Sequence, residues 1–346
     1  MFTVPAIPLG EIDGWKIRKA GFSARVVNAA ARAGAETVRD IRTRSDADLI
    51  GMASIGPASV DEVRRFWARC QAIAAGQCYF LTLPDAIEPF IDTENWAVLI
   101  RRYGLYRPDP AASRKFMTLQ EIGNELNLTR ERIRQVEAQA LHSLRANLPR
   151  HCLSPFLRYL RAFIELRQGV VSTADMQDLE GQSWLAGLNP CSVFLLLHDI
   201  DGNYFQRHNQ LFHIYRETEI DAAAQEAVEW LNQQHELASL QKLWDAIHGQ
   251  ISLTAPAALA KIIEQVPEVV STIDQQYLTT PTALDDLLRE LLEAEQEPLH
   301  YREITTLLNQ RLLRACRKGP GHVLRHLNAS KRMQKTARGK YAVKHG

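Results

Sequence analysis

The chain has 346 residues, of which 46% are hydrophobic, and a formal net charge of +1 at pH 7. This length suffices for a buried core and favours two or more units over one domain, while the near-neutral charge excludes a basic field over the whole protein. No apolar run reaches the ~20 residues of a membrane helix, and the start lacks the pattern of a signal peptide, so we expect a cytoplasmic protein without a membrane partner. The five cysteines show no metal-binding spacing and are expected to be reduced core thiols.

Apolar residues recur at helical spacing along almost the whole chain, and the alternation typical of strands is scarce. Prolines and polar breaks divide the chain into five expected units: 1–76, 80–150, 151–217, 218–282 and 283–346. We therefore expect a mainly α fold class. It is a multi-domain array of small helical modules, namely a helix-hairpin-helix, a helix-turn-helix and winged helices with short β-hairpins.

The first unit, 1–76, contains a glycine turn followed by a helix start. An Ile-Gly-Pro turn ends at Pro57, and Ser59 with Glu62 has the spacing of a capping box that opens a helix. A helix N-terminus behind such a turn offers free backbone N–H groups to an anion such as a phosphate. This part of the unit is therefore a candidate phosphate contact.

Residues 13–75, which include the run GFSARVVNAAARAGAETVRD, resemble the C-terminal domain of the alpha subunit of bacterial RNA polymerase, a helix-hairpin-helix fold. The DNA contacts that the resemblance implies are Arg25 and Asn28 in the minor groove and Gly56 and Ser59 at a phosphate. Pro57 and Ala58 stand where the family carries lysines. Docking to a protein is therefore an alternative role for this unit.

The second unit, 80–150, contains the run MTLQEIGNELNLTRERIRQVEAQALHSLR, in which two helices are separated by a turn. Thr118 and Glu121 form a capping box that begins the first helix, and Thr129 caps the second. Gly123 permits close approach of the second helix, and Asn127 suits a left-handed turn position. The residues expected on the buried faces are Leu119, Ile122 and Leu126 in the first helix, and Ile133, Val136, Ala140 and Leu144 in the second. The spacing thus predicts a helix-turn-helix.

The second helix presents polar side chains on its outward face. Glu131, Gln135, Ala138 and His142 point away from the buried stripe, with Arg134 beside them. Arginine can bind guanine with two hydrogen bonds, glutamine can bind adenine, and glutamate can accept from cytosine. Residues near the start of such a helix reach base edges in the major groove. A solvated helix face would show the same residue types.

The run TRERIRQVEAQAL (Thr129–Leu141) is similar to region 4 of the sigma-70 family of bacterial initiation factors, and NWAVLIRRYGLY upstream looks like the start of that region. Residues 84–148 can thus be read as a whole region 4. In that family the domain reads the −35 promoter element and docks on the polymerase flap. The residues that the resemblance places toward the bases are Arg130, Glu131, Arg134 and Gln135. No counterpart of region 2 is recognisable, so we expect no capacity to melt promoters.

The remaining units share a loose plan of helices followed by a hairpin, which is the layout of a winged helix. In 151–217 the hairpin is NYFQRHNQLFHIY with a turn at Asn209, and in 283–346 it is MQKTARGKYAVK with a bend at Gly339. The unit 218–282 fits the plan weakly and is expected to be a degenerate winged helix or simply helical.

The last unit is strongly basic, since no Asp or Glu follows Glu303, whereas residues 285–297 are rich in acids. Such charge segregation is typical of a partner surface or a tail. The unit resembles the HARE-type winged helix, with 319–329 as its third helix and 333–344 as its wing. The side chains expected to gather on a DNA-facing surface are Arg325, Lys331, Arg332, Lys335, Arg338 and Lys340.

Signatures of catalysis are absent from the sequence: there is no HExxH, GxSxG, Walker or GxGxxG motif. His208 and His213 lie five residues apart in an expected hairpin, and alternation along the chain places them on opposite faces. We therefore expect no enzyme, no metal site and no cofactor.

The resemblances together predict a sequence-specific DNA-binding protein of bacterial transcription initiation or regulation, located at the nucleoid. Its expected partners are double-stranded DNA and RNA polymerase, with no small-molecule substrate. One alternative is a DNA-recognition or scaffold subunit of a defence or mobile-element system. Another is a protein–protein scaffold made of degenerate winged helices.

Overall fold

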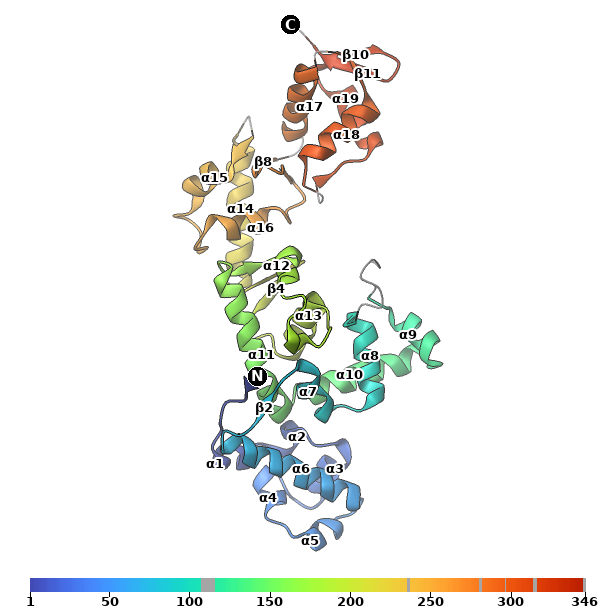
Figure 1. The fold of residues 1–346 in the computed structure, drawn as a ribbon, viewed down its shortest axis with the longest axis vertical. Helices are drawn as coiled ribbons and strands as arrows, with labels where there is room; N and C mark the ends of the chain where they lie inside the picture. The colour runs from blue at the N-terminus through green and yellow to red at the C-terminus, as the bar shows by residue number, and fades with distance from the viewer. Residues whose placement is uncertain (107–115, 235–236, 280–281, 296, 314–315, 345–346) are drawn as a thin grey trace. The chain divides into compact units, whose positions relative to one another are not determined.

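In the computed structural model, the described residues are 1–106, 116–234, 237–279, 282–295, 297–313 and 316–344. They are mainly helical, and their strands are short and antiparallel, which confirms the expected fold class (Figure 1). Their contacts define two compact units. Unit 1 comprises Met1–Phe163 and Thr173–Phe205, and unit 2 comprises Ile164–Ser172 and Gln206–Gly346. None of the described helices has the length and hydropathy that crossing a membrane requires.

The N-terminal module of unit 1 consists of short helices and one long helix, α6, around two small cores. Capping boxes begin two of them, at Thr37 with Asp40 and at Ser45 with Asp48, and a left-handed glycine, Gly21, ends a third. The helices are α1 (Leu9–Asp13), α2 (Ile17–Ala20), α3 (Ala24–Arg32), α4 (Val38–Arg42), α5 (Asp46–Ile50) and α6 (Pro57–Ala74). The strands β1 (Phe2–Thr3) and β2 (Tyr79–Phe80) pair antiparallel and bring the two ends of the module together.

The second module of unit 1 packs three helices around a compact apolar core. Its helical elements are α7 (Leu83–Ile87), the 3-10 helix η1 (Glu88–Phe90), α8 (Thr93–Tyr103), α9 (Leu119–Leu126) and α10 (Arg130–Leu144). The core consists of Val98 from α8, Ile122 from α9, and Ile133 and Val136 from α10, all buried. Because α8 supplies the support behind α9 and α10, the helix-turn-helix is held as one rigid group.

The rest of the protein repeats one order of elements: helix, strand, two helices and a hairpin. The first repeat has α11 (Asn147–Leu166), β3 (Val170–Val171), α12 (Thr173–Gln177), η2 (Ser183–Leu185), α13 (Pro190–Ile200), β4 (Gln206–His208) and β5 (Leu211–His213). The second has α14 (Glu217–Asn232), β6 (Ala238–Ser239), α15 (Leu240–Ile247), α16 (Pro256–Ile263), β7 (Val269–Ser271) and β8 (Gln276–Thr279). The third has α17 (Thr282–Glu295), β9 (Leu299–His300), α18 (Tyr301–Arg311), α19 (Pro320–Ala329), β10 (Met333–Ala337) and β11 (Lys340–Val343).

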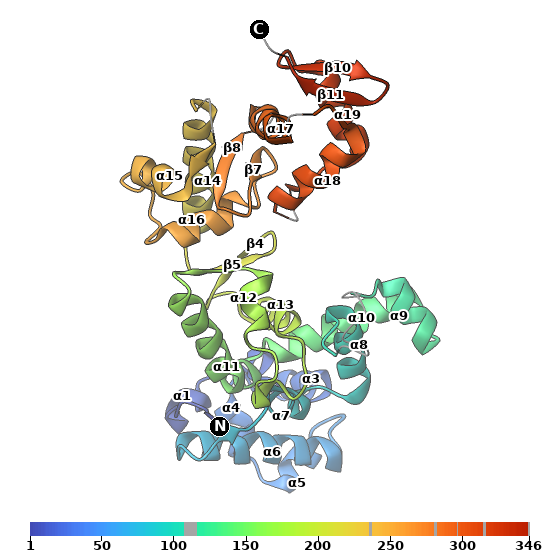
Figure 2. The same ribbon diagram turned by 45° about the horizontal axis from the view of Figure 1, so that its top comes forward.

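The three repeats also share sheet topology. In each, the early strand pairs with the last strand of the hairpin, giving the orders β3-β5-β4, β6-β8-β7 and β9-β11-β10. The expected hairpins at Asn209 and Gly339 are confirmed, and Figure 2 shows the latter beside α19. The segment 218–282, which the sequence fits to this plan only weakly, has the same order of elements as the other two repeats. Its hairpin turn takes positive φ at Gln275 rather than at Gly or Asn, so the usual turn signal is missing.

Helices of the first repeat anchor both modules of unit 1. From α11, Leu148 and Cys152 join the core of the N-terminal module. From α13, Asp199 accepts a hydrogen bond of 2.6 Å from the hydroxyl of Tyr103 on α8, and the hydroxyl of Ser192 donates to the carbonyl of Gly104 at 3.0 Å. The two modules are therefore joined to a common support.

Candidate nucleic-acid interface

The helix-turn-helix has the local geometry that its sequence predicts. At its start, the hydroxyl of Thr118 accepts from the backbone N–H of Glu121 at 3.2 Å, and the Glu121 carboxylate accepts from the N–H of Thr118 at 2.8 Å. Asn127 adopts the left-handed conformation (φ 54°, ψ 40°), and the hydroxyl of Thr129 accepts from the N–H of Arg132 at 3.1 Å. Both helix starts and the turn are thus confirmed.

Gly123 is required by the close contact between α9 and the turn. A Cβ atom at this position would lie 2.6 Å from the backbone carbonyl oxygen of Leu128, closer than side-chain atoms approach a backbone oxygen. The N–H of Leu128 in turn donates to the carbonyl of Gly123 at 2.9 Å. The glycine therefore fixes the angle at which α10 leaves the turn.

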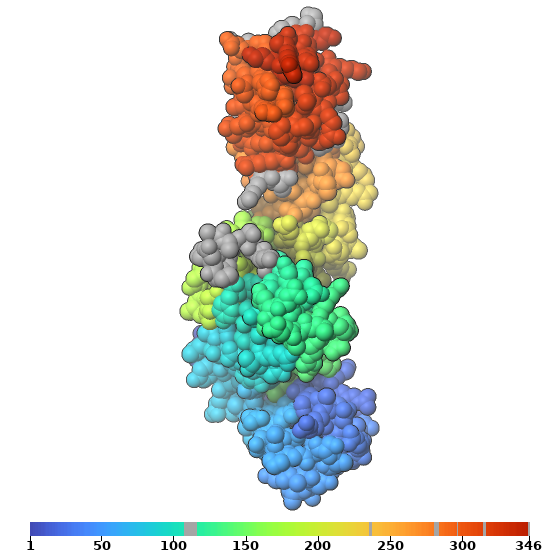
Figure 3. Space-filling view, turned by 90° about the vertical axis from the view of Figure 1, so that its right-hand side faces the viewer, coloured from blue at the N-terminus to red at the C-terminus, as the bar shows by residue number. Residues whose placement is uncertain are grey.

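The outward face of α10 carries a hydrogen-bonded polar group. Arg134 donates to both carboxylate oxygens of Glu131, at 2.8 and 2.7 Å, and the side-chain amide of Gln135 donates to the same carboxylate at 3.1 Å. These hydrogen bonds, first from Arg134 and then from Gln135, lower the pKa of Glu131 to about 2. All three residues, together with Arg130, are exposed, and residues 118–145 face the viewer in Figure 3. The structure thus brings together the four residues expected to face the bases.

The module is also held together by a set of ion pairs that the sequence does not predict. Each pair joins an arginine of α8 or α10 to a glutamate of a different helix. The pairs are Arg101 with Glu125 (3.0 Å), Arg102 with Glu137 (3.0 Å) and Arg132 with Glu94 (3.3 Å). They join residues 24 to 38 positions apart, so no local sequence pattern announces them. These arginines support the helices rather than offering unengaged charge.

In the N-terminal module, Arg25 and Asn28 are exposed on α3. The capping box expected at Ser59 and Glu62 is wrong, since α6 begins at Pro57 with Gly56 as its N-cap. The physical reason is that proline presets the backbone angle of a first helical residue and needs no hydrogen bond there. Ser59 is buried and its N–H donates to the carbonyl of Gly56 at 3.0 Å, so its side chain is not presented to a phosphate.

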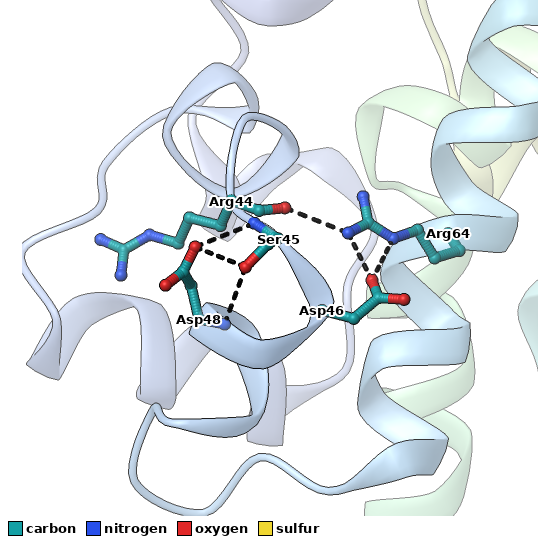
Figure 4. Close-up of polar contacts among 5 residues, drawn as sticks. All are labelled: Arg44, Ser45, Asp46, Asp48 and Arg64. Atoms are coloured by element: carbon teal, nitrogen blue, oxygen red, sulfur yellow. Dashed lines mark hydrogen bonds and ion pairs between the residues drawn. The ribbon is translucent and has the colours of Figure 1, made fainter.

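Behind this turn, a network ties α5 to α6 (Figure 4). Ser45 and Asp48 form the capping box of α5, in which the N–H of Asp48 donates to the Ser45 hydroxyl at 3.1 Å. Arg64 reaches from α6, donating through Nε to Asp46 at 2.7 Å and through its terminal nitrogen to the carbonyl of Arg44 at 3.0 Å. The two arms of the hairpin are thereby held in place. The Ser-x-x-Asp spacing at Ser45 is a sequence signal for the capping box, whereas the contacts of Arg64 join residues 18 and 20 positions apart and have no local signal.

The C-terminal repeat presents all six of its expected cations to solvent. Exposed residues of this set are Arg325 on α19 and Lys331, Arg332, Lys335, Arg338 and Lys340 on or beside the wing. Arg332 differs from the others because it forms ion pairs with Asp286 (2.7 Å) and Asp285 (3.9 Å) of α17. The acidic and basic stretches thus partly neutralise each other inside one folded repeat, and the basic stretch is not a separate tail.

The expectation that His208 and His213 lie on opposite faces is wrong. In the hairpin, His208 pairs with Leu211 and Gln206 pairs with His213. Directly paired residues share a face, and residues two apart on one strand share it as well. Both histidines therefore point to the same side, where each approaches Glu217. The two-residue turn resets the alternation, so the five-residue spacing does not place the two histidines on opposite faces.

Comparison with known proteins assigns two segments of unit 1. Residues 92–146 match the family of sigma-70 region 4, and residues 11–66 match the family of the C-terminal domain of the bacterial RNA polymerase alpha subunit. A stretch of 79 residues, 22% of this protein, is 45% identical to the RNA polymerase sigma factor RpoD of Helicobacter pylori, in both strain 26695 and strain J99. It spans 11% of the length of each relative. One polypeptide thus carries a unit similar to sigma region 4 and a unit similar to the alpha C-terminal domain.

Proposed function

We propose that this protein binds promoter-like double-stranded DNA in a sequence-specific manner and acts in bacterial transcription initiation or its regulation, in the cytoplasm and at the nucleoid. The observation that carries the proposal is the exposed Glu131–Arg134–Gln135 group on α10. It lies within the segment that matches sigma region 4. The capped helices and the Gly123 contact hold α10 at a set angle, which recognition of base edges requires.

The chemistry of this face suits the major groove. Arg134 keeps donors on its second terminal nitrogen for guanine, Gln135 can bind adenine, and Glu131 can accept from the amino group of cytosine. Because its pKa is lowered to about 2, Glu131 is ionised at neutral pH and remains an acceptor. Arg130 is the first residue of α10, and in this proposal it faces the bases together with the other three, because residues near the start of such a helix reach base edges.

The N-terminal module adds a second contact in this proposal. Arg25 and Asn28 are exposed on α3 and are proposed to enter the minor groove, and the turn at Gly56 approaches a phosphate through the backbone. Since Ser59 is buried, we assign it a role in positioning that turn. The absence of lysine at Pro57 and Ala58 makes docking on RNA polymerase a second use of the same surface.

The C-terminal wing supplies the third contact. The logarithm of the binding constant falls linearly with the logarithm of the salt concentration. Each phosphate that a lysine or arginine neutralises makes this slope steeper by about 0.9. Lys331, Lys335, Arg338 and Lys340 are exposed, and such side chains bind the backbone of any sequence. We therefore assign the wing to affinity and α10 to specificity.

Selection of duplexes from a random pool by the full-length protein tests the proposal, followed by titration of the selected site and a shuffled control. A short enriched motif, bound at least tenfold more tightly than the shuffled duplex, is the expected result. Enrichment of no motif, with equal affinity for both duplexes, contradicts the proposal.

A second candidate function is a DNA-recognition or scaffold subunit of a defence or mobile-element system. It is supported by the three helix-and-hairpin repeats, which begin at Asn147 and lie outside both matched segments. Affinity purification of the protein from its own cells separates the two. Recovery of RNA polymerase favours the transcription role, and recovery of a nuclease or helicase without polymerase favours the second candidate.

A further inference from the structure

The hairpin β4–β5 and the start of α14 bring four potential metal ligands together. His208 Nδ1 lies 2.7 Å from Glu217 Oε1 and 4.0 Å from Asp221 Oδ1, and His213 Nε2 lies 3.7 Å from Glu217 Oε2. Ligand atoms of His208, Glu217 and Asp221 all lie within 4.8 Å of one another. All four residues belong to unit 2.

These separations are close to those of a tetrahedral zinc site. Bonds of about 2.0–2.2 Å from zinc to histidine nitrogen and carboxylate oxygen place neighbouring ligand atoms about 3.3–3.5 Å apart. The three distances, from 2.7 to 4.0 Å, bracket this range. His208, Glu217 and Asp221 thus form a closely grouped set of three ligands. His213, which approaches this set through Glu217, would turn further than the other three to reach a common cation.

The orientation of His213 is a second and independent observation. Its side chain is fully buried, and its Nδ1 lies 3.1 Å from the carbonyl oxygen of Tyr215. A carbonyl only accepts, so Nδ1 must carry the hydrogen. The ring thus directs Nε2 toward Glu217. A metal-binding histidine characteristically donates its other ring N–H to a carbonyl or carboxylate in this way, which fixes the tautomer.

We propose that His208, His213, Glu217 and Asp221 bind a divalent transition-metal cation, with Zn²⁺ the best match to two imidazoles and two carboxylates. In the metal-free form, His208 Nδ1 donates to Glu217. Metal binding removes this proton, which leaves with solvent or moves to Nε2, and both groups then become ligands.

The site would join the wing of the first repeat to the first helix of the second. His208 and His213 come from β4 and β5, whereas Glu217 and Asp221 lie one turn apart at the start of α14. A bound cation stabilises the folded form in proportion to its affinity and concentration. It would thereby fix the angle between the hairpin and α14.

The test is calorimetric titration of the chelator-treated full-length protein with Zn²⁺, accompanied by thermal unfolding and by the visible spectrum with Co²⁺. We expect one equivalent of Zn²⁺, a rise in Tm of about 5 °C at a hundredfold excess over Kd, and the strong absorption of four-coordinate Co²⁺. Asp221→Asn and His208→Gln should each weaken binding about tenfold or more. The side chain of Asp221 is exposed and that of His208 is half-buried, and circular dichroism verifies that both variants fold.

Matched controls are Glu229→Gln, a carboxylate farther along α14, and His248→Gln, an exposed histidine of the second repeat. Both should bind Zn²⁺ like the parent protein. Binding that does not saturate near one equivalent at micromolar protein overturns the proposal. A Kd that stays unchanged in either Asp221→Asn or His208→Gln overturns it as well.

Discussion

The helix-turn-helix and the C-terminal wing both expose cations, but they hold them differently. In the helix-turn-helix module, Arg134 is bound to Glu131 by two hydrogen bonds, and Arg132 is bound to Glu94. On the wing, Lys335 and Arg338 are exposed and form no ion pair with any other residue that the structure describes. The same residue types thus occur as oriented groups in one region and as unconstrained charges in the other.

This difference indicates which features of DNA the outward face of α10 and the C-terminal wing can each recognise. A guanidinium with a fixed direction can distinguish base edges, whose donors and acceptors lie in set positions. A lysine on a mobile stem gains as much from one phosphate as from the next, because the backbone charge is uniform. We infer that α10 decides which sequence is bound and that the wing decides how tightly any sequence is bound.

The largest expected effect is that of Gly123→Ala, which displaces the whole oriented surface of α10. Its Cβ would lie 2.6 Å from the Leu128 carbonyl oxygen, so the turn must shift. We expect a loss of about 1–3 kcal/mol in the free energy of unfolding and a rise of about a hundredfold in Kd for the selected site, equivalent to two lost base contacts. Denaturant unfolding and DNA titration measure both.

Gly10→Ala is the matched control, because a Cβ there would contact nothing within 4 Å. It should leave both quantities unchanged or slightly improve stability. Equal behaviour of the two variants would show that the close contact at Gly123 is unimportant.

Next in size is Arg134→Ala, which removes one oriented group and leaves the fold intact. We expect a loss of about 1–3 kcal/mol for the selected site and relaxed preference at one base pair. Arg132→Ala is its control, since Arg132 is bound to Glu94 of α8. That variant should lower stability by less than about 1 kcal/mol and keep the base preference.

The combined change Lys335→Ala, Arg338→Ala and Lys340→Ala tests the role assigned to the wing. We expect Kd to rise roughly tenfold for selected and shuffled duplexes alike, and the salt slope to fall by about 2.7. Arg332→Ala serves as control. Because Asp286 already engages this arginine at 2.7 Å, its removal should change the salt slope by less than about 0.9.

The smallest effect concerns His322, on the first turn of α19. Burial, followed by the charges of Lys318 and Arg325, lowers the pKa of His322, so the ring is neutral in the free protein at pH 7. A nearby DNA phosphate favours the charged form and raises this pKa. Binding then takes up a proton, and affinity should increase by about twofold to threefold as the pH falls from about 7 to 6. Titrations of His322→Gln should lack this increase.

The helix-turn-helix could be predicted from the sequence because its determinants are local. Thr118 with Glu121, Gly123 and Asn127 each act within a few residues, and the structure has them as expected. The ion pair between Arg102 and Glu137 could not be predicted, since it joins residues 35 positions apart. Contacts of this kind depend on how the helices pack, which no local spacing specifies.

The sequence pattern was misleading at two places, the start of helix α6 and the hairpin that carries His208 and His213. Ser59 and Glu62 have the spacing of a capping box, but Pro57 takes the first helical position of α6. Ser59 is therefore inside the first turn of the helix, where it is buried. At His208 and His213, alternation was counted through the turn, whereas the register pairs His208 with Leu211. The first prediction lacked the residue at which the helix begins, and the second lacked the register in which the two strands pair.

The most direct test of the division between α10 and the wing is the specificity ratio, Kd for a shuffled duplex divided by Kd for the selected site. It should be measured at one salt concentration for three proteins: the parent protein, Arg134→Ala, and the combined Lys335, Arg338 and Lys340 variant. The account predicts a ratio that falls about tenfold in Arg134→Ala and stays unchanged in the wing variant. A ratio that survives in Arg134→Ala, or that falls in the wing variant, contradicts it.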